Sequence, residues 1–123
     1  MKHAFNSTYA DGSDATLVKP SNWNDVHVYG VRNVSTSGNI QSTDDLVLAT
    51  GGAGGITLTL PSPSANANKP FIIKKVDSAA GIVTINPNAA ETIDGQASWQ
   101  LVNQYQHVEV VSDGTNWQVT RIS

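Results

Sequence analysis

The sequence predicts an all-β fold, a small antiparallel β-sandwich or barrel-like domain with an extended N-terminal arm. Three observations lead to this prediction. Apolar and polar residues alternate in short runs, turn-forming residues lie between the runs, and no window of helical length carries apolar residues at i, i+3, i+4 and i+7. The 123 residues suffice for one domain with one hydrophobic core and a short arm.

A change in composition near Gly30 divides the chain into an arm, residues 1–30, and an oligomerising β domain, residues 31–123. The arm has few aliphatic residues and no periodicity, so it cannot bury enough apolar area to offset the entropy lost on ordering. Large aromatic residues occur in it at intervals, which is typical of a segment that orders against another surface. We interpret it as a docking arm; a loose N-terminus without a role is the alternative. Its aromatic anchors are Phe5, Tyr9, Trp23 and Tyr29.

Short strands with turns between them fill the first part of the β domain. A glycine-rich turn at residues 51–55 reverses the chain, Pro61 and Pro63 end one strand, and Asn86-Pro87 ends another. The strands expected here lie at residues 46–49, 56–60, 71–76 and 82–85.

The last part of the domain contains the clearest pattern. Two alternating runs, residues 108–111 and 117–122, flank a turn that contains Asp113-Gly114, which predicts a β-hairpin. Before it, a short apolar stretch at residues 92–93 precedes an Asp-Gly turn, and residues 99–101 alternate again.

Two sets of motifs make the chain recognisable. Pro20-Ser21, Trp23-Asn24 and His27 form the most telling part of residues 11–27, which resemble a segment near the start of many tailed-phage virion proteins. The body is similar to small β domains of phage fibres, head fibres and capsid decorations. That similarity rests on the order of several short motifs, at residues 44–48, 56–61, 71–77, 83–85, 91–95 and 111–117.

The resemblance implies a structural protein of the virion, made in the host cytoplasm and often homotrimeric. Its arm is then expected to dock on the capsid or on another virion protein through Phe5, Tyr9, Leu17, Pro20, Trp23, Asn24 and His27. At 123 residues, without long shaft repeats or a separate tip domain, the chain differs from a typical tail fibre. We therefore expect a capsid decoration or head fibre protein; a tail fibre or spike component that binds host glycan is the alternative.

The composition argues against several other classes of protein. Charged residues make up only 14% of the chain, against about a quarter in ordinary globular proteins. Seven basic residues among ten acidic ones, with a net charge of −3, do not suit nucleic-acid binding, which depends on Lys and Arg. No apolar run approaches the ~20 residues of a membrane helix, the N-terminus lacks the apolar stretch of a secretory signal, and there is no cysteine.

We expect no metal or cofactor site. His3, His27 and His107 are far apart in the sequence, although in a trimer copies of one histidine can meet on the axis. Asp11, Ser13 and Asp14 offer oxygen ligands for calcium, but their spacing does not match the twelve-residue calcium loop. Turn or capping roles are expected for them and for Asp44, Asp45 and Asp77.

We expect no enzymatic activity either. The glycines at residues 51–55 precede a strand rather than a helix, so they predict a flexible turn and not a phosphate cradle. No serine or threonine lies in a nucleophile-elbow context. Two carboxylate pairs, Glu91 with Asp94 and Glu109 with Asp113, leave a phage-borne polysaccharide hydrolase as a third option.

The tryptophans in the β domain have different expected roles. Trp117, directly after the Asp-Gly turn, is expected to pack in the core. Trp99 and Tyr105 are the candidates for an oligomer interface or a surface-binding site, and for Trp99 the core is a further alternative.

Overall fold

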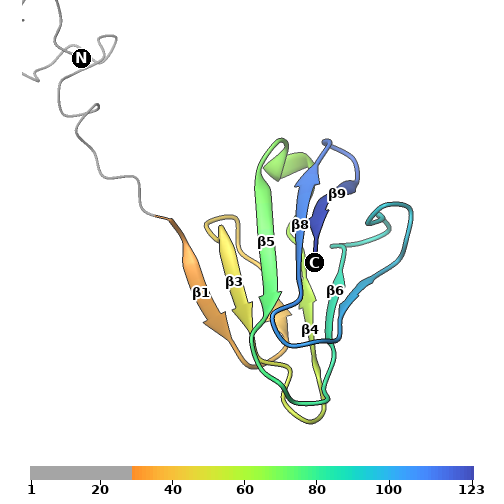
Figure 1. The fold of residues 1–123 in the computed structure, drawn as a ribbon. Helices are drawn as coiled ribbons and strands as arrows, with labels where there is room; N and C mark the ends of the chain where they lie inside the picture. The colour runs from red at the N-terminus through yellow and green to blue at the C-terminus, as the bar shows by residue number, and fades with distance from the viewer. Residues whose placement is uncertain (1–28) are drawn as a thin grey trace, which may run out of the picture.

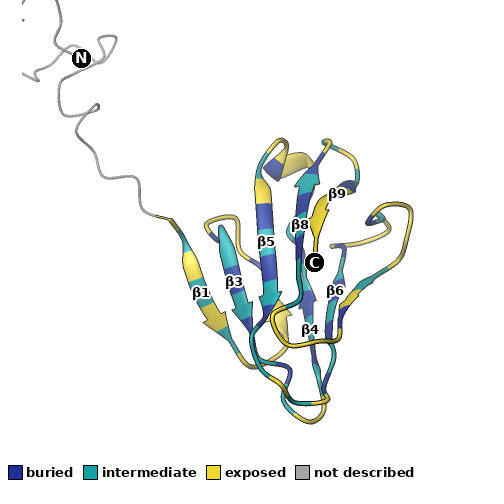
Figure 2. Ribbon diagram, in the orientation of Figure 1, coloured by how far each residue is buried: buried dark blue, intermediate teal, exposed yellow. Residues whose placement is uncertain are grey.

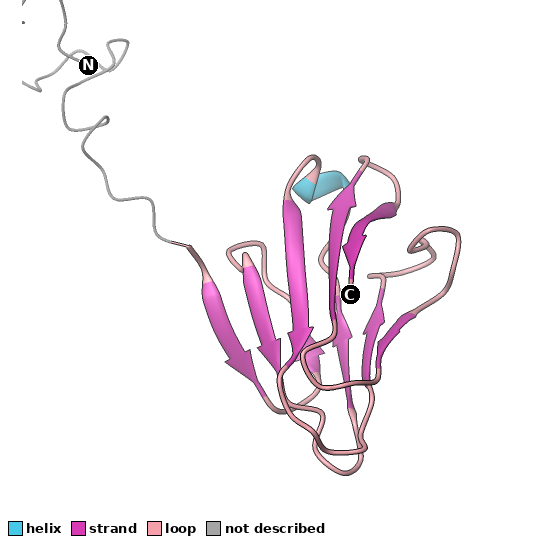
Figure 3. Cartoon of the chain, viewed as in Figure 1, coloured by secondary structure: helices cyan, strands magenta, loops and turns pink. Residues whose placement is uncertain are grey.

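The computed structural model describes residues 29–123, which form an all-β body of two mixed sheets (Figure 1). In this part of the chain the only helical element is the 3-10 turn η1 (Ser64–Asn66), which Figure 3 shows among strands and loops. The strands are β1 (Val31–Val34), β2 (Gly38–Asn39), β3 (Leu46–Ala49), β4 (Ile56–Thr59), β5 (Pro70–Lys75), β6 (Val83–Asn86), β7 (Trp99–Leu101), β8 (His107–Ser112) and β9 (Trp117–Ile122).

The chain alternates between the two sheets for its first six strands. One sheet has the order β1-β3-β5-β8-β9 and the other the order β2-β4-β6-β7. Strands β1, β3 and β5 run parallel, and so do β2, β4 and β6. Three successive pairs of strands along the chain, β1 with β2, β3 with β4 and β5 with β6, therefore each contribute one strand to each sheet.

The expected antiparallel arrangement is wrong for the four pairs formed among these six strands, β1–β3, β3–β5, β2–β4 and β4–β6. It is correct only for the pairs β5–β8, β6–β7 and β8–β9. Two parallel neighbours need a crossover connection, which in many proteins is a helix. Here the crossover is itself a strand in the other sheet, so the lack of a helical pattern did not exclude parallel pairing.

The positions of the strands agree closely with the sequence analysis. The ranges expected at residues 46–49 and 99–101 are those of β3 and β7, and the other expected strands differ from β4, β5, β6, β8 and β9 by one residue at most at either end. The β8–β9 hairpin is confirmed, with a bulge between Glu109 and Val110. Residues 92–93 form no strand; Ile93 makes only isolated bridges to Gln96 and Trp117.

A single hydrophobic core takes its side chains from both sheets. Along β3, β5 and β8 buried residues alternate with half-buried ones, a pattern visible in Figure 2. Phe71 and Trp117 are the largest apolar core residues, and their rings meet edge to face with centroids 5.6 Å apart. The core residues are Ile40, Val47, Ala49, Ile56, Leu58, Leu60, Phe71, Ile73, Val83, Ile85, Ile93, Leu101, Val108, Val110 and Trp117. None of the described residues belongs to a helix long and apolar enough to cross a membrane.

Candidate functional site

The outer face of the five-stranded sheet carries aliphatic side chains. Because side chains alternate along a strand, the residues between the buried core positions of β3, β5 and β8 point away from the core. We call the aliphatic residues that lie outward on this sheet the aliphatic face: Val31, Leu46, Leu48, Ile72 and Val111. Val31 is 50% exposed and the other four are half-buried. Strand register aligns Val31, Leu46 and Ile72 in one row across three strands.

Charged residues occupy the rest of this outer face, on β5, β8 and β9, and we call them the charged border. Lys74 lies between Leu48 and His107 in one row, and the row of Val31, Leu46 and Ile72 continues into Glu109 and Arg121. An oxygen of Glu109 accepts a hydrogen bond from the Thr120 hydroxyl at 2.8 Å and lies 3.7 Å from the Arg121 Nε. The border therefore has a basic row beside an acidic position.

Tyr105 lies next to the basic row, in the loop before β8. The Lys74 ammonium is 5.3 Å from the centroid of its ring, within the range of a cation–π contact. The ring is 59% exposed, and the residue adopts a left-handed backbone with φ of 66°. Its backbone N–H donates to the carbonyl of Lys75 at 2.6 Å, which ties this loop to β5.

The outer face of the four-stranded sheet has a different chemistry. Its central strands present threonine and asparagine where the other sheet presents leucine and isoleucine. The outward residues of β4, β6 and β7 are Thr57, Thr59, Thr84, Asn86 and Gln100. The outer face of the five-stranded sheet thus carries aliphatic and charged residues, whereas the outward residues of β4, β6 and β7 are uncharged and form hydrogen bonds.

The glycine-rich turn at residues 51–55 holds an anion, but that anion belongs to the chain itself. The Asp77 carboxylate accepts the backbone N–H groups of Gly51 at 3.0 Å and Gly52 at 2.9 Å. The Lys75 ammonium and the N–H of Gly51 stabilise the charged carboxylate and hold the pKa of Asp77 far below its ordinary value. The turn expected from the sequence is confirmed, and these two N–H groups are already occupied by a side chain.

Three other carboxylates, all in or beside loops, also stabilise the structure. Asp44 is buried, accepts two hydrogen bonds from the Arg32 guanidinium side by side, at 3.1 and 2.8 Å, and caps the turn at Gln41. Asp45 accepts the Gly30 N–H at 2.6 Å and the Lys69 ammonium at 3.0 Å, and these two contacts lower the pKa of Asp45. Asp113 accepts the N–H groups of two residues in the hairpin turn, which lower its pKa as well. The turn or capping roles expected for Asp44, Asp45 and Asp77 are therefore confirmed.

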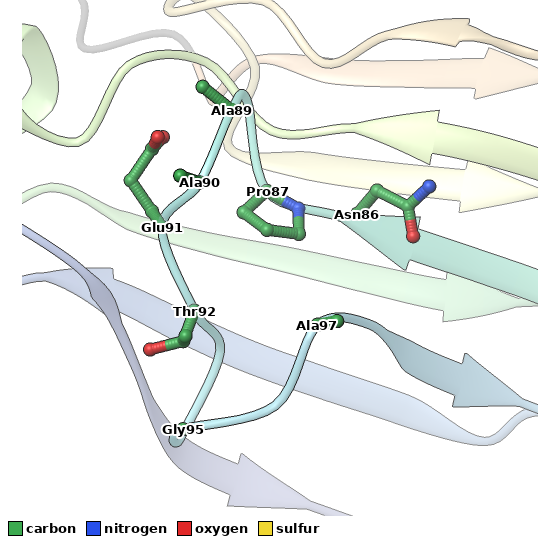
Figure 4. Close-up of a pocket in the computed structure, with 8 residues that line it drawn as sticks. All are labelled: Asn86, Pro87, Ala89, Ala90, Glu91, Thr92, Gly95 and Ala97. Carbon is green, nitrogen blue, oxygen red and sulfur yellow. The ribbon is translucent and has the colours of Figure 1, made fainter.

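A shallow pocket of about 410 Å³ lies in the loop between β6 and β7 (Figure 4). It is lined by Asn86, Pro87, Ala89, Ala90, Glu91, Thr92, Gly95 and Ala97. One oxygen of Glu91 is buried without a hydrogen-bond partner in the structure, and in Figure 4 this side chain points away from Gly95 and Ala97.

The carboxylate pairs considered for hydrolysis have separate local roles. Asp94 does not line the pocket with Glu91, because its carboxylate accepts the Val119 N–H at 2.9 Å. Glu109 lies on the charged border and Asp113 in the hairpin turn. Among residues 29–123, no three His, Cys, Asp or Glu side chains are grouped as a metal ion would require.

The structure locates three of the aromatic residues singled out in the sequence. Trp117 is fully buried, as predicted for a packing residue. Trp99 is half-buried and packs against the core, and Tyr105 is exposed beside Lys74. The arm residues Phe5, Tyr9, Leu17, Pro20, Trp23, Asn24 and His27 lie outside the described residues.

The sequence analysis expected an oligomerising β domain but did not say which residues form an apolar outer face, although a signal for them was present. Residues 46–49 and 71–73 are apolar at consecutive positions instead of alternate ones. Strands with apolar side chains on both faces are typical of parallel sheets covered on both sides.

No family model matches this sequence, and no curated protein matches it significantly.

Proposed function

We propose that this chain is a non-enzymatic structural protein of a tailed-phage virion, a capsid decoration or head fibre protein. It docks on the particle through its N-terminal residues and assembles as a homotrimer, and its two sheets form a sandwich. The resemblance of residues 11–27 and of the body motifs to virion proteins supports the class of protein.

The observation that carries an assembly role is the aliphatic face. Leu46, Leu48 and Ile72 stand on the central strands of the five-stranded sheet, where a solvent-facing sheet ordinarily has polar residues. Contiguous exposed apolar surface on a small domain is typical of a contact with another protein. A structural protein that works in many copies has a use for such a face.

Weak docking contacts are sufficient if the body is oligomeric. When one arm of a trimer has bound, the second and third bind at high effective concentration, so overall attachment becomes much stronger than any single contact. The low charge of the chain leaves hydrogen bonding and shape to determine these contacts.

The experiment that tests this proposal is a particle-binding assay. Purified protein is mixed with phage particles and with isolated tails, and both are imaged. Regularly spaced density over the head supports a decoration or head fibre role. Density confined to the tail, or none on either sample, rejects it.

A tail fibre or spike component that binds cell-surface saccharide is the second candidate. The exposed ring of Tyr105 favours it, because aromatic rings stack on the faces of sugars. Binding of the pure protein to host cells, lost in Tyr105→Ala, supports this candidate; no binding to host cells argues against it.

A further inference from the structure

We propose that the aliphatic face of the five-stranded sheet is covered by a second copy of this chain. This inference goes beyond the proposed homotrimer, because a face-to-face contact pairs two copies and is separate from any trimer interface. It does not depend on which part of a virion the assembled protein binds.

The first argument is the position of the aliphatic residues. Val31, Leu46 and Ile72 form one row across β1, β3 and β5, and Leu48 stands beside Lys74 in the next. The described residues form two sheets only, and the inner faces of both are used in the core, so no third sheet covers this row. Two copies that meet through this face remove the same aliphatic surface from water twice.

The second argument is the charge at the border of the face, which favours a copy of this chain over another partner. Within residues 29–123 Lys74 forms no ion pair. Glu109 lies one row away, on the neighbouring strand β8. If two copies meet face to face with their strands running in opposite directions, the two rows exchange places. Glu109 of one copy then faces the row that holds Lys74 and His107 in the other copy, while Leu46 faces Leu48.

The size of the face sets the expected strength of the contact. Five strands about 4.8 Å apart, of four or six residues and so about 13–20 Å long, present less than about 400 Å² of planar area. A standard interface buries about 800 Å² on each partner. We therefore expect an association that depends on concentration in the micromolar range, not one that is permanent.

The first test measures the mass of the full-length protein by light scattering and sedimentation over a range of concentrations up to about 100 µM. Leu46→Glu places a charge on an inner strand of the face, where both lateral neighbours, Val31 and Ile72, are aliphatic. The control is Thr84→Glu, at the matching outward position of β6 between Thr57 and Gln100. We expect Leu46→Glu to weaken association about tenfold or more and Thr84→Glu to leave it unchanged.

A second test uses two charge-reversal variants, in case Leu46→Glu disturbs the fold. Lys74→Glu alone and Glu109→Lys alone should each associate less well than the original protein, because like charges meet across the contact. A mixture of the two variants should recover association, because each copy then offers the opposite charge to its partner.

Three results overturn the inference: a mass that does not rise over the concentration range, a Leu46→Glu variant that is folded and associates normally, or a mixture that associates no better than its components. These results are independent of the particle-binding assay. Association through this face without binding to particles retains the inference and rejects the virion role. Binding to particles by a protein that stays monomeric rejects the inference and retains the virion role.

Discussion

The Lys75 ammonium lies 2.9 Å from a carboxylate oxygen of Asp77, and it also donates to the carbonyl groups of Asp77 and Ala79 at 2.8 and 2.9 Å. The lysine side chain is fully buried, so all three of its N–H donors are used inside the protein. The same carboxylate caps the glycine-rich turn through Gly51 and Gly52. One ion pair therefore links the end of β5 to the loop between β3 and β4.

Lys75→Met should lower the thermal unfolding temperature by several degrees, because it leaves the Asp77 carboxylate and two carbonyl groups without their donor. The measurement is thermal unfolding followed by circular dichroism. Lys74→Met is the control, since Lys74 is the next residue of β5 but points outward, and it should change the temperature little. Equal effects of the two substitutions would contradict the assigned role of Lys75.

The stability of the protein should fall as the pH drops below about 4. The pKa of Asp77 in the folded protein lies well below its ordinary value of 3.8, and the pKa values of Asp45 and Asp113 are also lowered. A carboxylate with a lowered folded pKa stabilises the fold above its ordinary pKa, and this contribution is lost as the pH falls toward the folded value. Urea unfolding between about pH 7 and pH 2 measures the effect. Asp77→Asn should be less stable at neutral pH and should lose less stability on acidification; an unchanged slope contradicts the prediction.

Trp117→Ala should destabilise the protein by about 3–5 kcal/mol, because it removes a fully buried aromatic side chain from the core. Trp117→Phe should cost clearly less. It keeps an aromatic ring near Phe71, and it removes an indole N–H that has no hydrogen-bond acceptor in the structure. Urea unfolding of both variants tests this order; a loss for Trp117→Phe as large as that for Trp117→Ala would contradict it.

Gly81→Ala should cost about 1–3 kcal/mol through backbone crowding. A Cβ atom at Gly81 would meet the carbonyl oxygen of Gly52 and the backbone nitrogen of Gly55, two groups that cannot rotate away. Gly54→Ala is the matched control, because a Cβ atom there meets nothing within 4 Å. Chemical denaturation should show a loss for the first variant and none for the second; equal stabilities would contradict the close approach at Gly81.

Removal of residues 1–28 should leave a folded, self-associating body that no longer attaches to particles. The cut spares Gly30, whose N–H donates to Asp45 and whose carbonyl accepts from the N–H groups of Asp45 and Leu46. Circular dichroism and light scattering measure fold and mass, and co-sedimentation with particles measures attachment. Full-length Trp23→Ala should show weakened attachment with the same mass. If the truncated protein still attaches, the docking arm is wrongly assigned.

The strand positions and the hairpin were predictable from the sequence because their signals are local. Alternation over residues 117–122 and the Asp113-Gly114 turn each lie within one element, and the position of Trp117 directly after that turn predicted a packing role for it. Lys75 was predictable too, since it shares the parity of Phe71 and Ile73 along β5, but a lysine is seldom fully buried. The sequence analysis assigned Lys75 no role.

Strand pairing was not predictable in the same way, because it depends on segments far apart in the chain. Leu46 pairs with Ile72, and Ile56 with Val83, across crossovers that contain strands of the other sheet. A local pattern shows that a strand has two apolar faces, but it does not show which segment lies beside it. The aliphatic face exists only because this pairing places Val31, Leu46 and Ile72 in one row.

The sequence by itself determined that the body is made of strands, where most of them begin and end, and which large aromatic residue fills the core. The tertiary structure decided that the first six strands pair in parallel, that Asp77 occupies the glycine-rich turn, and that aliphatic side chains gather on one outer face. The physical reason is the separation along the chain over which each kind of interaction acts. Turn and strand preferences act between neighbours in the chain, whereas burial, ion pairing and surface character depend on groups brought together only when the whole body has folded.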